Sequence, residues 1–165
     1  MILPDVNLLI YAFNRNAPHH VAARTWWEGL MNGGEPVAIP WAVSLGFVRL
    51  MTQRAVLVAP MEPRAAVDAV RAWLARPGVE IIEPGPQHLA ILDRLFAATG
   101  TAGALTSDAH LAALAIEHQC ELHSSDSDFA RFPGLRWRNP VSVAAPGARE
   151  RRTRYGRGAA DRAAR

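Results

Sequence analysis

Cysteine is almost absent from this sequence of 165 residues, since Cys120 is the only one. A single thiol excludes disulfide bonds within one chain and indicates a reducing, cytoplasmic setting. Long hydrophobic runs are also missing: none reaches the roughly 20 apolar residues that a membrane-spanning helix requires. The N-terminal segment lacks the basic start and small-residue cleavage site of a signal peptide. We therefore expect a cytoplasmic protein with no membrane association.

Lysine is absent altogether, so all 18 basic residues are arginines, and they are unevenly spread. From Arg149 onward, seven arginines outnumber the two acids, Glu150 and Asp161. Residues 144–165 also contain almost no large apolar side chains, which is typical of a disordered segment. We expect one domain over residues 1–143 and a basic tail over residues 144–165. The tail either binds nucleic acid electrostatically or only keeps the protein in solution.

Short apolar segments alternate with helical patterns along the expected domain. The expected strands are residues 1–5, 37–39, 80–82, 121–124 and 135–140, and the expected helices are 7–13, 19–31, 41–53, 63–75, 86–100 and 106–119. Asn7 and Ser107 have the side chains that cap helix N-termini. The alternation predicts an α/β fold with a parallel sheet covered by helices on both faces.

Four aspartates occupy comparable places in this pattern. Asp5 ends the first strand inside an apolar run, where an unpaired carboxylate is costly. Asp108 lies at a helix start, and Asp126 and Asp128 follow the strand at 121–124. Taken singly, Asp108 fits a charge at a helix N-terminus, and Asp126 and Asp128 fit a polar turn. Taken together, they are expected at one rim of the sheet, where ligands of parallel α/β proteins bind.

Carboxylates gathered at one rim repel one another unless a proton or a cation neutralises them. Mg²⁺ binds through one or two carboxylates and keeps several waters. The matching chemistry is hydrolysis of phosphate esters, in which a metal ion lowers the pKa of water and stabilises charged oxygens.

Three stretches carry a resemblance to a known family. They are "DVNLLIYAFN" from Asp5, "WAVSLGFVRLMT" from Trp41 and "SDAHLAALAIEHQCELHSSDSDFARF" from Ser107. Over roughly residues 1–140 the chain resembles PIN-domain ribonucleases, most of all the VapC toxins of type II toxin–antitoxin systems. The resemblance implies a PIN-like three-layer α/β/α sandwich with a mostly parallel central sheet. It also implies an Mg²⁺- or Mn²⁺-dependent endoribonuclease that acts on RNA, forms a homodimer and is neutralised by a VapB-type antitoxin.

The resemblance also implies roles for individual residues. Asp5, Asp108 and Asp126 would be the catalytic metal ligands, with Asp128 as an accessory acid and Asn7 as the polar residue that supports Asp5.

One position departs from the family pattern. Many members carry a glutamate where this chain has Gly46, and no acid lies between Glu35 and Glu62. We expect a reduced metal site, and the alternative is a catalytically weak or inactive relative that binds RNA or protein. A third reading, a phosphatase with Asp5 as nucleophile, would want a second aspartate where Asn7 stands.

Several other side chains have two open readings. His110 either faces the acidic site or lies at the surface, and Trp41 is expected in the core. Phosphate contacts around the acids could come from any of Arg15, Arg24, Arg49 and Arg54, or these side chains could be merely solvated.

Overall fold

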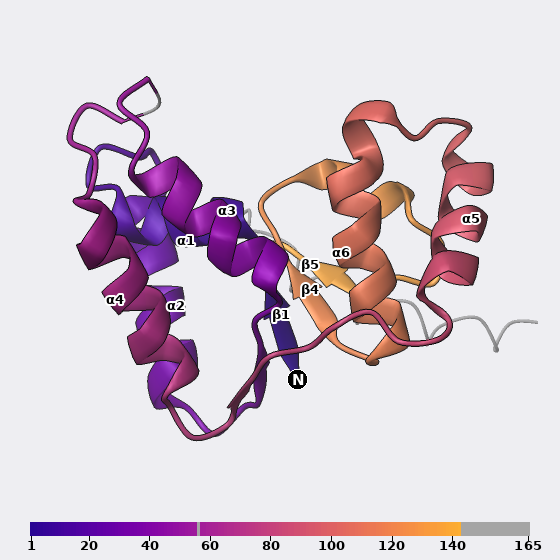
Figure 1. Cartoon of the computed structure of the whole chain (residues 1–165), viewed down its shortest axis with the longest axis horizontal. Helices are drawn as coiled ribbons and strands as arrows, with labels where there is room; N and C mark the ends of the chain where they lie inside the picture. Colours follow the sequence, from indigo (N-terminus) through magenta and orange to yellow (C-terminus); the bar gives the residue numbers. More distant parts are fainter. Residues whose placement is uncertain (56, 143–165) are drawn as a thin grey trace, which may run out of the picture.

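A sheet of parallel strands forms the centre of the molecule (Figure 1). The computed structural model describes residues 1–55 and 57–142, and the expected tail over 144–165 lies outside the described residues. The strands in the described part are β1 (Ile2–Pro4), β2 (Val37–Ala38), β3 (Val79–Glu80), β4 (Glu121–His123) and β5 (Trp137–Arg138). Their order is β3-β2-β1-β4-β5, and every neighbouring pair is parallel.

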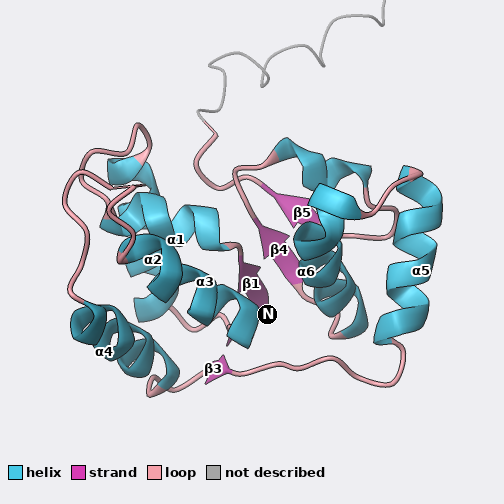
Figure 2. Cartoon of the chain, turned by 45° about the horizontal axis from the view of Figure 1, so that its top comes forward, coloured by secondary structure: helices cyan, strands magenta, loops and turns pink. Residues whose placement is uncertain are grey.

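Helices cover both faces of this sheet. The described part contains α1 (Val6–Phe13), α2 (His20–Asn32), α3 (Trp41–Met51), α4 (Pro63–Leu74), α5 (His88–Thr99) and α6 (Thr106–Glu117), with short 3₁₀ turns η1 (Gly103–Leu105) and η2 (Ser127–Arg131). Figures 1 and 2 show α1 to α4 gathered on one side of the strands and α5 with α6 on the other. The predicted three-layer α/β/α sandwich is confirmed. None of the described helices is long and apolar enough to cross a membrane.

The core explains why α6 can lie close to the sheet. Its buried face consists largely of alanine, and Ala109, Ala112 and Ala113 are completely buried. Small side chains allow a helix backbone to approach the strands closely, and Leu3 of β1 and Leu122 of β4 are completely buried in the same core. The start of α6 is therefore held firmly beside the ends of β1 and β4.

The strand order creates a topological switch point at β1. From β1 the chain crosses to β2 and β3 on one side, and then returns to β4 and β5 on the other side. The backbone N–H of Asp5 donates to the carbonyl oxygen of His123 at 2.8 Å, so β1 and β4 stay joined up to their carboxyl ends. Ligands of parallel α/β sheets bind outside the carboxyl ends of the strands at such a switch point.

Three local expectations were wrong. Asn7 and Ser107 do not cap their helices, because the N-cap positions of α1 and α6 fall two residues earlier, at Asp5 and Leu105. Asp5 has the extended backbone of an N-cap residue, which lets the strand pass directly into the helix. Trp41 is not in the core: it is 48% exposed at the start of α3.

Candidate active site

Asp5 is a buried carboxylate whose partner is a hydroxyl group. It is only 6% exposed, and the Ser124 hydroxyl, which is completely buried, donates to its Oδ2 at 2.7 Å. Ser124 Oγ in turn accepts from Asn7 Nδ2 at 2.9 Å and from the backbone N–H of Asp126 at 3.0 Å. One serine at the end of β4 therefore joins three of the predicted site residues. Sequence reasoning missed Ser124, although its place directly after a buried strand was a usable signal.

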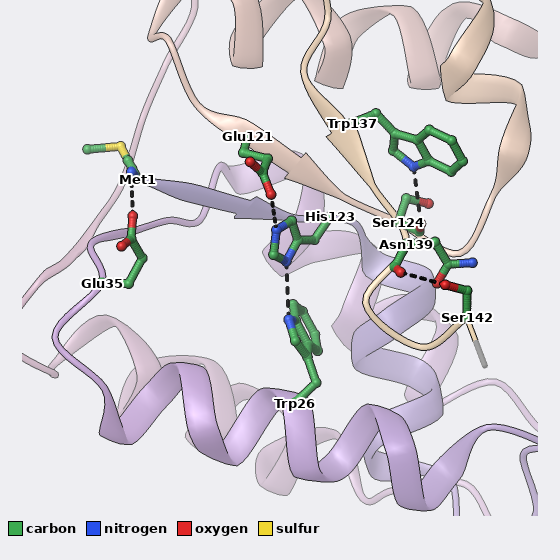
Figure 3. Close-up of polar contacts among 9 residues, drawn as sticks. All are labelled: Met1, Trp26, Glu35, Glu121, His123, Ser124, Trp137, Asn139 and Ser142. Carbon is green, nitrogen blue, oxygen red and sulfur yellow. Dashed lines mark hydrogen bonds and ion pairs between the residues drawn. The ribbon is translucent and has the colours of Figure 1, made fainter. Parts of the chain in front are cut away.

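A network of hydrogen bonds fixes the end of β4, which Ser124 follows directly (Figure 3). Trp26 of α2 donates its indole N–H to His123 Nδ1 at 3.1 Å, and His123 Nε2 lies 2.8 Å from Glu121 Oε1. Because Nδ1 accepts, Nε2 carries the proton and donates to the carboxylate. The Trp137 indole donates to the Ser124 carbonyl oxygen at 3.1 Å. These contacts hold Ser124 in position from α2 and from the neighbouring strand β5.

A cavity of about 460 Å³ opens beside Asp5. Residues from α1, α3, α5 and α6 line it: Asp5, Val6, Ala42, Val43, Gly46, Arg49, Leu92, Thr106, Ser107, Asp108, His110 and Leu111. Asp5 and Asp108 therefore share one cavity although they are far apart in sequence. Most of the other walls are apolar, and such a cavity with a few convergent polar groups is typical of a binding site.

The acids influence one another electrostatically. Burial raises the pKa of Asp108 to about 6, and the charges of Asp5, Asp126 and Asp128 add to the shift. Burial also raises the pKa of Asp5, although the Ser124 hydroxyl and the backbone amides of Val6 and Asn7 oppose it, and Asp126 raises it further. These shifts indicate that the four aspartates lie within electrostatic range of one another.

Asp126 also has a structural role in its turn. Its Oδ1 accepts from the backbone N–H of Asp128 at 2.8 Å and so caps η2. The Asp128 carboxylate lies 3.7 Å from Arg131. Within residues 1–55 and 57–142, no group of three Asp, Glu, His or Cys side chains lies close enough to hold a metal ion by itself. The arrangement fits a hard cation that keeps most of its waters better than one held in a full protein cage.

Gly46 faces the same cavity from α3. A Cβ atom at this position would meet Val6 Cγ2 at 3.3 Å, which is tight. Position 46, where the resemblance implies an acid, therefore lines the same cavity as Asp5 and Asp108, and glycine leaves room there for the Val6 side chain.

The remaining candidate residues differ in whether they line the cavity beside Asp5. His110 lines the cavity, which favours the reading that it faces the site. Burial lowers the pKa of His110, and the neighbouring His88 lowers it further. Among the four candidate arginines, Arg49 also lines the cavity, whereas Arg15 and Arg24 line a separate one between α2 and α4. Arg24 is already paired with Glu28 at 2.7 Å.

Replacing Ser124 by alanine should destabilise the fold and disturb Asp5. The change leaves a buried carboxylate without its side-chain donor, and we expect a loss of about 1–3 kcal/mol in the free energy of unfolding. Denaturant titration measures this loss. Ser127→Ala, at an exposed position, serves as control and should cost less than about 0.5 kcal/mol. Equal stability of the two variants would show that the hydroxyl does not hold Asp5.

The raised pKa of Asp108 predicts a pH-dependent stability in metal-free protein. Between the ordinary pKa of 3.8 and about 6, the folded state retains a proton that the unfolded chain has lost. Asp108 therefore destabilises the fold increasingly as the pH rises through this window. His110 and His123, whose pKa values are lowered by burial, act in the opposite direction, so a comparison with Asp108→Asn is needed. The stability advantage of Asp108→Asn should grow from pH 4 to pH 6 and then level off; a constant difference would contradict the shift.

Comparison with known proteins identifies the class of the chain. A PIN domain family model matches residues 2–135, so the chain belongs to the PIN-domain family. It is similar to Ribonuclease VapC33 of Mycobacterium tuberculosis, with 43% identity over 141 residues, 86% of this chain and 99% of that protein. Ribonuclease VapC37 of the same species is 41% identical over 143 residues, 87% of this chain and 99% of that protein. The resemblance to VapC-type PIN ribonucleases is confirmed.

Solved structures agree on the fold. VapBC2 from Rickettsia felis, crystallised with a DNA fragment from its promoter, aligns with a TM-score of 0.62 at 20% identity, covering 84% of this chain and 98% of that one. VapC20 of Mycobacterium tuberculosis, described as a sarcin-ricin loop cleaving toxin, aligns with a TM-score of 0.59 at 18% identity, covering 82% and 99%. At these identities the likeness concerns the fold alone.

Proposed function

We propose that this chain is the toxin of a type II toxin–antitoxin system and a metal-dependent endoribonuclease that hydrolyses RNA phosphodiester bonds. The observation that carries the proposal is the cavity that Asp5 and Asp108 share at the switch point of the sheet, with Asp126 joined to Asp5 through Ser124. The ribonuclease relatives supply the reaction class, and the carboxylates supply a place where such chemistry can occur.

Asp5, Asp108 and Asp126 are the side chains that would hold Mg²⁺ or Mn²⁺, with Asp128 as an accessory acid and Asn7 as support. Their oxygen atoms are the ligands that hard divalent cations prefer, and their mutual repulsion favours a bound cation. When bound, such an ion lowers the pKa of water and offsets charge on the phosphoryl oxygens.

The remaining residues orient the reactants. Ser124 holds one oxygen of Asp5 and so fixes the orientation of the carboxylate. Arg49 lines the cavity as an exposed cation and would bind the RNA phosphate beside the acids. The apolar walls exclude bulk water, which strengthens these electrostatic contacts.

Partners follow from the same family. We propose a VapB-type antitoxin as the neutralising partner, supported by the toxin–antitoxin complexes among the structural neighbours. We also propose a homodimer. Trp41 and Leu45 lie one turn apart on α3 and are 48% and 62% exposed, and exposed aromatic and aliphatic side chains of this kind are typical of protein interfaces. Both proposals assume that the protein acts in the cytoplasm, where its RNA substrate is found.

The decisive experiment is cleavage of cellular RNA by purified protein with Mg²⁺ or Mn²⁺. Because water is the nucleophile, we expect products with 5′-phosphate and 3′-hydroxyl ends, and EDTA should abolish cleavage until metal is restored. Products with 2′,3′-cyclic phosphates, or cleavage that persists in EDTA, would contradict the mechanism. RNA binding without turnover under either metal would favour the catalytically inactive relative, which the glycine at position 46 makes a real alternative.

A further inference from the structure

A second cavity, between α1, α2 and α4, lies outside the proposed active site. Its volume is about 450 Å³, and its lining contains three arginines, Arg15, Arg24 and Arg76, with a single acid, Glu28. The chain is otherwise mildly acidic, since residues 1–142 contain 13 acids and 11 arginines. Three of those arginines at one cavity are a local excess of positive charge, which indicates an anionic ligand. We call it the basic cavity.

Arg76 is held in place by contacts within the chain. Its Nε donates to the carbonyl oxygen of Met31 at 2.9 Å, and its Nη2 donates to Asn32 Oδ1 at 2.8 Å. A guanidinium group has five N–H donors, so three remain for a further acceptor. A planar cation that is already fixed in position is well suited to bind the oxygen atoms of a phosphate.

The other two arginines differ in their partners. Arg24 is paired with Glu28 at 2.7 Å, so the one acid of the basic cavity is already neutralised. Arg15 follows α1 and forms no ion pair within residues 1–55 and 57–142. One cation of the basic cavity can therefore bind a ligand without giving up a partner.

The remaining lining of the basic cavity is largely aromatic. Trp27 and Trp73 line it, are 4% and 6% exposed, and pack edge to face with ring centroids 5.2 Å apart. The arginines, in contrast, are exposed. Buried rings beneath exposed cations reduce the local dielectric constant, so each contact between an arginine and an anion is stronger than in open water.

Helix α1 connects the basic cavity with the acidic one that Asp5 and Asp108 share. Asp5 and Val6 at its start line the acidic cavity, and Ala12 and Phe13 at its end line the basic one. A helix of this length spans about 12 Å. A stacked nucleic acid strand advances about 3.4 Å per phosphate, so a strand along α1 would reach the basic cavity about four nucleotides from the acidic one.

We propose that Arg15, Arg24 and Arg76 form a second subsite that binds a backbone phosphate of RNA about four nucleotides from the bond that is cut. The identity of the ligand rests on the proposed ribonuclease function. RNA is favoured over an acidic segment of a protein because a strand lying along α1 meets both cavities, and because a polyanion that approaches four aspartates needs cations nearby. The subsite fixes the register of the strand and takes no part in hydrolysis.

The first test measures RNA binding with EDTA present, so that the result does not depend on cleavage. Arg15→Gln should weaken the binding of a single-stranded RNA roughly fivefold at about 0.1 M salt, and it should reduce the slope of log K against log salt by about 0.7, the value for one lost phosphate contact. Arg24→Gln should act in the same direction.

Arg94→Gln is the matched control, because it removes the same charge from an exposed position on α5, across the sheet from the basic cavity (Figure 2). It should leave the salt slope unchanged. An Arg15→Gln variant with the slope of the wild type, or an Arg94→Gln variant with the same loss, would overturn the proposal.

The second test locates the subsite along the RNA. A cleaved oligoribonucleotide is shortened from each end, one nucleotide at a time, and kcat/KM is measured. The wild type should lose roughly fivefold or more in one step, when the phosphate about four nucleotides from the cut is removed. In the double variant of Arg15→Gln with Arg24→Gln, that step should disappear, and a step that persists would contradict the subsite.

The remaining outcomes separate this proposal from the others. If the arginine variants bind RNA like the wild type but bind the antitoxin more weakly, the basic cavity is a protein-docking site and the proposal is wrong. If the wild type cleaves no RNA under Mg²⁺ or Mn²⁺, the proposed function fails, whereas the salt slopes still decide whether the basic cavity binds a phosphate.

Discussion

Replacing Asp108 by asparagine should lower kcat/KM for RNA cleavage by roughly a thousandfold, because it removes several kcal/mol of charge stabilisation at the reacting phosphate. The substitution is nearly isosteric, and the wild-type carboxylate is destabilised by burial and by three neighbouring aspartates. The metal-free variant should therefore be as stable as the wild type or more so at pH 7. Loss of activity with stability retained is the signature of a functional acid.

The measurement compares cleavage rates and thermal unfolding of the same preparations. Asp93→Asn on α5 is the matched control, since Asp93 is exposed and does not line the cavity. It should retain full activity. If Asp108→Asn cleaves RNA within tenfold of the wild type, Asp108 is only a charge at a helix N-terminus. A destabilised, inactive variant would instead indicate a structural role.

Asp5→Asn tests the role of the Asp5 carboxylate separately from that of Asp108. Asparagine at this position can still accept from the Ser124 hydroxyl through its amide oxygen, so the fold should survive. Activity and Mg²⁺ affinity should nevertheless fall together, whereas an unchanged affinity would place the metal elsewhere.

The sequence predicted the position of the acids because one rule of topology was enough. In a parallel sheet, every residue that follows a strand lies at the same rim, so Asp5 and Asp126 could be placed together without any distance. Asp108 could be placed at the same rim because a helix that connects two parallel strands runs antiparallel to them and begins at their carboxyl ends. The register of β1 against β4 then brings Pro4 beside His123, so Asp5 and Ser124 come next to each other.

The polar contacts behind the acids could not be predicted in this way. Ser124 and Asp5 are 119 residues apart, and only the three-dimensional structure shows that one hydroxyl serves Asp5, Asn7 and Asp126.

The errors at the helix starts have a different cause. Asn7 and Ser107 have good capping side chains, but the N-cap positions fall two residues earlier, at Asp5 and Leu105. Asn7 instead uses its amide to support Ser124. Trp41 was misjudged because a large aromatic residue in an apolar stretch fits either a core or an interface, and composition alone does not distinguish them.

Replacing Gly46 by glutamate should tighten Mg²⁺ binding by about tenfold, or about 1.4 kcal/mol. Gly46 faces the cavity that contains Asp5 and Asp108, so a carboxylate there adds an oxygen ligand and a negative charge. Without metal, the same charge should raise the pKa of Asp108 further and lower stability near pH 7. The increase in Tm on adding Mg²⁺ should therefore be larger in the variant than in the wild type.

The control must distinguish the effect of the added negative charge on Mg²⁺ binding from the effect of the larger side chain. Gly46→Gln has nearly the same size and the same gain in helix propensity as Gly46→Glu, but no charge. Both meet the same obstacle, since a Cβ at this position lies 3.3 Å from Val6 Cγ2. Val6→Ala removes that contact, so the double variant of Val6→Ala with Gly46→Glu should bind metal at least as tightly as Gly46→Glu alone. If the glutamate and glutamine variants titrate alike with Mg²⁺, residue 46 does not reach the ion, and glycine there reflects packing against Val6 rather than a missing ligand.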